Sequence, residues 1–127
     1  MQKDQSVNVL GGDLEPCSMA PMTGFFRDGC CNTNTMDQGN HTVCAVLTAE
    51  FLAFSKYVGN DLSTPRPEFG FPGLQPGDRW CLCAGRFLQA HDEGCAPRVN
   101  LAATHIRALD IVPLVVLQTH RIDSDHT

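Results

Sequence analysis

The apolar residues of this chain fall into short segments, separated by long stretches rich in glycine and proline. The strongest pattern begins after Thr48, whose hydroxyl suits a helix N-cap. It ends at Gly59, which tolerates a left-handed C-terminal turn. Between them, Phe51, Phe54 and Val58 recur at helical spacing. These positions predict a helix with one face toward a hydrophobic core.

Two further helices and several short strands are predicted in the same way. A helix over residues 84–93 is stopped by Gly94, and a last helix over residues 113–120 opens with a proline, which suits the first turn. Runs of apolar or β-branched residues predict strands. The strand candidates are residues 6–10, 41–47, 79–83, 98–102 and 109–112.

Strands and helices in mixed order favour helices packed on a small sheet. We therefore expect an α+β fold, a two-layer sandwich in which a small mixed sheet carries helices mainly on one face. The 127 residues suit a single domain, 1–127, that can build its core without metals or disulfides. Residues 1–5 and 123–127 are expected to be frayed tails.

Two long stretches, residues 11–40 and 59–78, show no periodic pattern. The second contains four glycines and four prolines. Loops longer than about 12–15 residues are often lids or binding loops. Because so many prolines restrict the chain, we favour a packed surface loop over a mobile lid.

The charge pattern narrows the expected partners. The net charge is −5, and the absence of any run of lysine or arginine argues against nucleic acid or an anionic membrane surface as a partner. The N-terminus lacks the apolar core of a signal peptide, and no apolar run approaches the roughly 20 residues of a membrane span. We therefore expect an acidic, soluble, cytoplasmic protein. Its seven cysteines would then be reduced thiols, which their odd number also favours.

Three interpretations of these cysteines stay open. The simplest is structural, because free cysteine packs like a small hydrophobic residue. Cys44, Cys81 and Cys83 lie in predicted strands and suit this interpretation, while Cys17 and Cys95 lie in predicted loops and suggest no role. The other two interpretations are a thiol nucleophile and a metal site.

A thiol nucleophile needs a base and a means of stabilising the thiolate. Cys30 and Cys31 follow a flexible polar approach that contains Arg27, which could stabilise a thiolate. His41 or His105 could be the base, so we take Cys30, Cys31, His41 and His105 as catalytic candidates. The carboxylates available to orient the histidine are Asp28, Asp61 and Asp78.

A metal site is disfavoured by the spacing, because structural zinc usually takes ligands from Cys-x₂₋₄-Cys pairs and this chain has none. On a strand, Cys81 and Cys83 would point to one face, about 6.6 Å apart. Cys44, His41 or His105 could complete a ligand set, although His41 and Cys44 would point to opposite faces of a regular strand. If a metal is bound after all, the ligands we expect are Cys44, Cys81 and Cys83. No cofactor is indicated.

Several unusual segments resemble one known family. They include MTGFFRDGCC at residues 22–31, HTVCAV at 41–46, GNDLSTP at 59–65, PGDRWCLCA at 76–84 and ATH at 103–105, together with FPGL at 71–74. The chain is similar over about residues 9–120 to a mostly bacterial family of uncharacterised proteins, domain-of-unknown-function family 2237. It departs from the family at Phe87, where we would expect tryptophan.

The resemblance implies a small cytosolic two-layer α/β domain that usually stands alone, and it implies no function. It also implies that, if its motif residues converge in space, that point is the site. These residues are Arg27, Asp28, Cys30, Cys31, His41, Cys44, Asn60, Asp61, Asp78, Cys81, Cys83 and His105.

The residues leave several functions open, and they do not decide whether the protein is an enzyme. The first is a small-molecule binding or catalytic domain, with a pocket between residues 24–31, residues 59–78 and the strand ends that carry Cys44 and Cys83. The ligand-binding candidates are Arg27, Asp28, Asn60, Asp61 and Asp78. The alternatives are a non-catalytic protein-interaction module and a Cys/His metal-binding domain.

Overall fold

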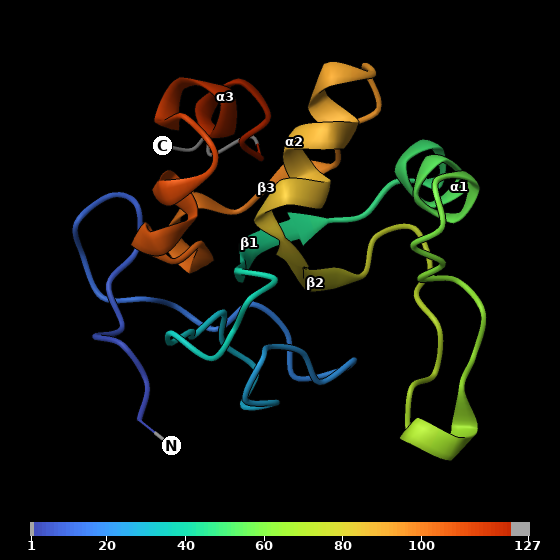
Figure 1. Cartoon of the computed structure of the whole chain (residues 1–127), viewed down its shortest axis with the longest axis horizontal. Coiled ribbons are helices and arrows are strands. Elements are labelled where there is room, and N and C mark those ends of the chain that lie inside the picture. Colours follow the sequence, from blue (N-terminus) through green and yellow to red (C-terminus); the bar gives the residue numbers. More distant parts are fainter. Residues whose placement is uncertain (1, 123–127) are drawn as a thin grey trace.

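The computed structural model describes residues 2–122 and has a three-stranded sheet at its centre (Figure 1). The strands are β1 (His41–Val46), β2 (Arg79–Cys83) and β3 (Arg98–Val99), in the order β2-β1-β3. Both pairings are antiparallel, whereas we expected a mixed sheet. β1 is the central strand, and four of its six residues are buried, as its apolar and β-branched composition predicts.

The helices are α1 (Ala49–Tyr57), α2 (Ala84–Asp92) and α3 (Leu114–Thr119), close to the predicted bounds. Thr48 caps α1 as expected, since its hydroxyl oxygen accepts a hydrogen bond from the Phe51 N–H at 3.0 Å. Three short 3₁₀ helices complete the elements: η1 (Pro67–Phe69), η2 (Leu101–Ala103) and η3 (Ile106–Asp110). The fold is the small α+β type that the sequence predicts.

The two faces of the sheet have different covers. Val43, Ala45 and Leu82 belong to the main apolar core, which also includes Phe87 of α2 and Leu117 of α3. The opposite face carries cysteines and is covered by the irregular N-terminal segment. Figure 1 shows this arrangement, with α2 and α3 on one side of the sheet and the blue N-terminal segment on the other.

Three predicted strands differ from the structure. Residues 6–10 make only the isolated bridges of Val7 and Asn8, and β3 is cut to two residues because η2 begins at Leu101. Residues 109–112 begin inside η3 instead of a strand. The side chain of His105 caps that 3₁₀ helix, which a pattern of apolar residues cannot reveal.

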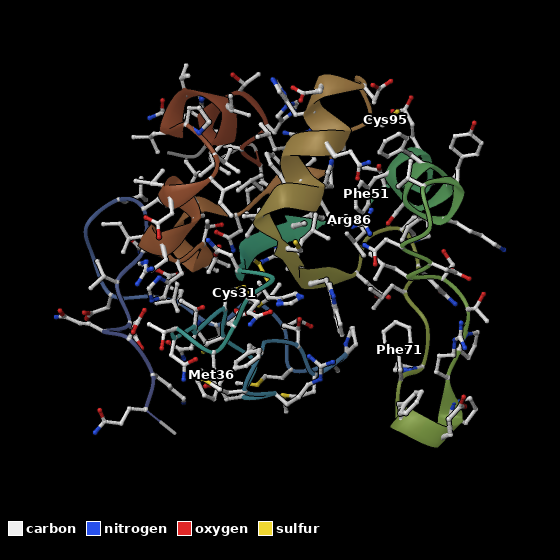
Figure 2. All side chains as sticks on the ribbon, in the orientation of Figure 1. Cys31, Met36, Phe51, Phe71, Arg86 and Cys95 are labelled. Carbon is white, nitrogen blue, oxygen red and sulfur yellow. A yellow bond between two sulfur atoms is a disulfide. The ribbon has the colours of Figure 1, made fainter. Side chains whose placement is uncertain are left out.

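The prediction that all seven cysteines are reduced is wrong for four of them. Disulfides join Cys17 to Cys44 and Cys31 to Cys81. Cys44 and Cys81 are direct neighbours across β1 and β2, so both bonds attach the N-terminal segment to the sheet. Figure 2 shows Cys31 at this junction. The free cysteines are Cys30, Cys83 and Cys95.

The predicted tails divide into two cases. Residues 123–127 and Met1 lie outside the described part of the chain. Within residues 2–5, the Asp4 N–H donates to the Thr33 carbonyl at 2.7 Å, and the Asp4 carboxylate pairs with Arg107 at 2.8 Å. Among residues 2–122, no helix has the length and apolar character needed to cross a membrane.

Candidate functional site

A buried carboxylate binds one ring nitrogen of His41. The Asp37 side chain is 1% exposed, and its Oδ1 lies 2.7 Å from His41 Nδ1. Its Oδ2 accepts hydrogen bonds from the His41 backbone N–H and the Thr33 hydroxyl, both at 2.9 Å. Because a carboxylate only accepts, this contact selects the tautomer with hydrogen on Nδ1, which leaves the lone pair of a neutral ring on Nε2. The ring itself is 42% exposed.

The turn before β1 is shaped around this ring. A Cβ atom on Gly39 would lie 2.4 Å from His41 Cε1, so a side chain there would displace the ring. Asn40 adopts a positive φ of 49°, and its carbonyl accepts the Ala84 N–H at 2.9 Å. That bond ties the start of β1 to the start of α2, so His41 and Cys83 are held at one point.

Cys83 occupies the junction between a strand and a helix. It is the last residue of β2 and the N-cap of α2, and it pairs with His41 across the sheet. Its thiol is free and half-buried. Among the described residues, no side chain caps α2 at this end. This end of α2 therefore presents backbone N–H groups, which favour negative charge, beside the Cys83 thiol.

Two adjoining pockets of about 320 and 190 Å³ meet at His41, Leu62 and Trp80, and we call them together the His41 cleft. The larger also contains Gly24, Phe25, Arg27 and Cys81. The smaller also contains Asn60, Leu82, Cys83 and Arg86. The cleft therefore runs along the outer edge of β2, and Figure 2 shows Arg86 at the start of α2.

The charges that line the His41 cleft are positive, although the protein as a whole is acidic. Arg27 and Arg86 each contribute a guanidinium, and none of the lining residues is Asp or Glu. Within residues 2–122, neither arginine forms an ion pair. Arg27 adopts a positive φ of 53°, donates to the Gly24 carbonyl at 2.7 Å, and stacks 5.1 Å from the ring centre of Trp80. An anionic ligand group is the natural partner of such a lining.

The structure corrects the assignment of Cys31 as a nucleophile, because its sulfur is fully buried and bonded to Cys81. Cys30 keeps a half-buried thiol outside the lining of the cleft. Burial and the nearby Asp28 carboxylate raise the pKa of Cys30, which lowers the thiolate fraction near neutral pH. The sulfurs named for a metal also differ in state, since Cys44 and Cys81 are oxidised and Cys83 is free.

His105, the other histidine named as a base, is buried away from the cleft. Its Nε2 donates to the Gln5 carbonyl at 2.9 Å, and its Nδ1 accepts the Arg107 N–H at 3.0 Å. Burial lowers the pKa of His105. Both nitrogens are thus occupied by the backbone, which gives the side chain a structural role.

Three carboxylates predicted to bind ligand instead organise local turns. Asp28 accepts from Lys3, the Cys30 N–H and Asn32, and these bonds outweigh burial and lower its pKa. The hydroxyl of Thr64 and the N–H groups of residues 63 and 64 bond to Asp61 and lower its pKa. The Asp78 carboxylate accepts the Gln75 N–H at 2.9 Å.

The His41 cleft therefore brings together only some of the site residues that the sequence predicted. Arg27, Asn60 and His41 line the cleft with Cys83, which the sequence placed at a strand end beside the predicted pocket and among the metal-ligand candidates, but not among the catalytic ones. Sequence reasoning missed Asp37 altogether. An acidic residue four positions before a histidine, in a turn rich in Asn and Gly, was the available signal.

The fold and the cleft define a small α+β protein with an Asp–His pair and a free cysteine beside a positively charged pocket. The model of one family, described as "Uncharacterized protein conserved in bacteria (DUF2237)", matches residues 7–121. The chain belongs to this family. None of the curated proteins matches it.

Proposed function

We propose that the His41 cleft binds a small anionic molecule and that Cys83 acts on it as a nucleophile. The observation that carries this proposal is the buried Asp37, which orients His41 into a pocket that Cys83 also lines. A nucleophile, a base and a group that orients the base are the parts that thiol catalysis needs. The proposal invokes a small-molecule ligand in the cytoplasm, without nucleic acid or membrane.

The geometry supports acyl transfer as the reaction class. His41 and Cys83 are paired across antiparallel strands, beside an irregularity of the ladder between His41 and Val43, and both residues line the smaller pocket of the His41 cleft. His41 Nε2 would take the Cys83 thiol proton, and the sulfur would attack the substrate carbonyl carbon. The leaving group departs with the proton from His41, and a thioester remains. Water, deprotonated by the same nitrogen, then hydrolyses the thioester and regenerates the thiol.

The surroundings of Cys83 suit the other needs of this reaction. The Ala84 N–H already donates to the Asn40 carbonyl, but the next N–H groups in the first turn of α2 have no side-chain cap, so they can donate to the oxyanion that develops on the carbonyl oxygen. Arg27 and Arg86 would bind an anionic group of the substrate. We therefore propose a carboxylated or phosphorylated ester, amide or thioester as the substrate class.

The first test measures thiol reactivity. We expect iodoacetamide to modify Cys83 faster than Cys30 or Cys95, as followed for each residue by mass spectrometry. The His41→Gln variant should slow the Cys83 reaction by about a hundredfold near neutral pH, because the thiol loses its base. Asp37→Asn should also slow it, because the amide no longer holds His41 in one tautomer.

His91→Gln is the matched control, since His91 lies outside the lining of the cleft and pairs with His120. It should leave the rate at Cys83 unchanged. An acyl-enzyme trapped with an activated ester that carries a carboxylate should map to Cys83. Equal rates at all three free thiols, or a Cys83 rate unaffected by His41→Gln, would refute the proposal.

A further inference from the structure

A second cluster of cysteines lies under the sheet, apart from the His41–Cys83 pair. Its members are Cys17, Cys31, Cys44, Cys81 and the small residue Ala103, all buried and separate from the main apolar core. None of the four sulfurs takes part in the reaction proposed above. We call them the four-sulfur cluster.

Three of the four sulfurs are as close to one another as the ligands of one ion can be. The Sγ atoms of Cys17, Cys31 and Cys81 all lie within 4.8 Å of one another. The fourth sulfur, of Cys44, is bonded to that of Cys17. In a tetrahedral zinc site with Zn–S distances of about 2.3 Å, the sulfurs are about 3.8 Å apart. Three sulfurs are therefore already near the spacing of that geometry, and the Cys44 sulfur would have to move toward them once its bond to Cys17 opens.

The backbone that carries the cluster is held independently of the disulfides. The Cys44 N–H donates to the buried Thr104 hydroxyl at 3.1 Å, and the Cys81 N–H donates to the Thr23 hydroxyl at 2.8 Å. On the N-terminal side, the Cys17 N–H donates to the Gly29 carbonyl at 2.7 Å. When the S–S bonds open, these hydrogen bonds would therefore hold Cys17, Cys44 and Cys81 near their present positions.

We propose that the reduced protein binds one zinc ion through Cys17, Cys31, Cys44 and Cys81. Each disulfide would take two electrons and two protons from a dithiol, which itself becomes a disulfide. The ion would then displace the four thiol protons to solvent and bind four thiolates. Metal and disulfides would thus be alternative states of the same residues, selected by the thiol poise of the compartment.

A route to the cluster exists through the His41 cleft. Cys81 lines the larger pocket although it is only 2% exposed, so this pocket is the side from which a reductant or an ion would approach the cluster. The same pocket carries Arg27, whose positive charge would favour the excess negative charge of a four-thiolate site nearby. Ligand type, spacing, backbone support and access all agree with a soft divalent cation.

The test uses a variant that keeps only the four-sulfur cluster: Cys30→Ser, Cys83→Ser and Cys95→Ser combined. After reduction with a phosphine and removal of oxygen, it should bind about one cobalt(II) per chain. The spectrum should show thiolate-to-cobalt charge transfer and the d–d bands of tetrahedral sulfur coordination. Zinc should displace the cobalt, and the oxidised variant should show neither band.

Adding Cys31→Ser to this variant should weaken cobalt binding by at least tenfold, while Ser18→Ala, a neighbour outside the cluster, should not. The proposal is overturned if the reduced triple variant binds less than a tenth of an equivalent, or if the oxidised form binds equally. Retention of full affinity after Cys31→Ser would also overturn it. Because this variant lacks Cys83, the result is independent of the proposed acyl transfer.

Discussion

The ring of His105 joins two segments that lie far apart along the chain. It reaches the Gln5 carbonyl with one nitrogen and the Arg107 N–H with the other, and so connects the N-terminal segment to η3. A neutral ring is required for this pattern, because the nitrogen that accepts from Arg107 must be unprotonated. The lowered pKa of His105 agrees with this requirement, because it favours the neutral ring.

The free energy of unfolding should therefore fall in mild acid. The pKa of His105 is below its ordinary value of 6.5 in the folded protein, so below about pH 6.5 the unfolded chain binds more protons. Each such histidine lowers stability by at most about 1.4 kcal/mol per pH unit. His120 has a lowered pKa too, through burial and its neighbours His91 and Arg98. Urea unfolding at pH 7.5 and 5.5 measures the effect.

The His105→Gln variant separates the two histidines. It should be less stable at pH 7.5, because one of two backbone contacts is lost, but it should lose less stability between pH 7.5 and 5.5. The lowered pKa of His120 contributes to the slope that remains. If His105→Gln kept the full pH dependence of the parent protein, the assignment to His105 would be wrong.

At the level of elements, local signals fix helix α1 more firmly than any other part of the fold. Thr48 supplies the cap, Glu50 lies in the first turn and Lys56 in the last, each with the sign that the helix dipole favours. Buried Phe51 and Leu52 then attach the helix to the core. Cap, charges and apolar face all favour the same helix, which is why its bounds were predictable.

Replacing Thr48 with alanine should destabilise the protein by about 1 kcal/mol, because the Phe51 N–H would lose its acceptor. Serine at the same position keeps the hydroxyl and is the matched control, with a loss of a few tenths of a kcal/mol at most. Chemical denaturation of the three proteins provides the comparison. Equal stability of the alanine and serine variants would contradict a capping role for this side chain.

The sequence also accounted for β1, β2 and the start of α2, since buried runs and breakers bound each of them. It did not account for the side of the sheet that lacks helices. There the cover is a segment without a repeating apolar pattern, so its path depends on contacts such as Asn8 with residues 13 and 102. The contact between Asp37 and His41 was unpredictable for the same reason, because it depends on the path of the turn at Gly39.

For the whole molecule, the two disulfides attach the N-terminal segment to the sheet, where regular strand pairing is missing among the described residues. They close loops with sequence separations of 27 and 50 residues, from the N-terminal segment to β1 and β2. Cross-links stabilise mainly by restricting the unfolded chain, and the effect grows slowly with loop length. The odd number of cysteines concealed both bonds, because three further thiols remain free.

Removing the bonds in pairs should weaken the fold as a whole. Loop lengths of this size correspond to roughly 3.5 kcal/mol for the Cys17–Cys44 bond and 4 kcal/mol for the Cys31–Cys81 bond. In the double variants Cys17→Ser/Cys44→Ser and Cys31→Ser/Cys81→Ser, studied with a chelator present, the free energy of unfolding from urea denaturation should fall by these amounts. Cys30→Ser/Cys95→Ser is the control and should change stability little. An unchanged midpoint in either disulfide variant would count against the cross-links.

Trp80 is the sole tryptophan of the chain. Its indole contacts the guanidinium of Arg27 and the ring of Phe71, whose centre is 5.6 Å away, and it borders both pockets of the His41 cleft. All tryptophan fluorescence therefore originates at the cleft wall. A molecule that enters and displaces Arg27 will quench or shift that emission, so occupancy can be followed by light from the unlabelled protein.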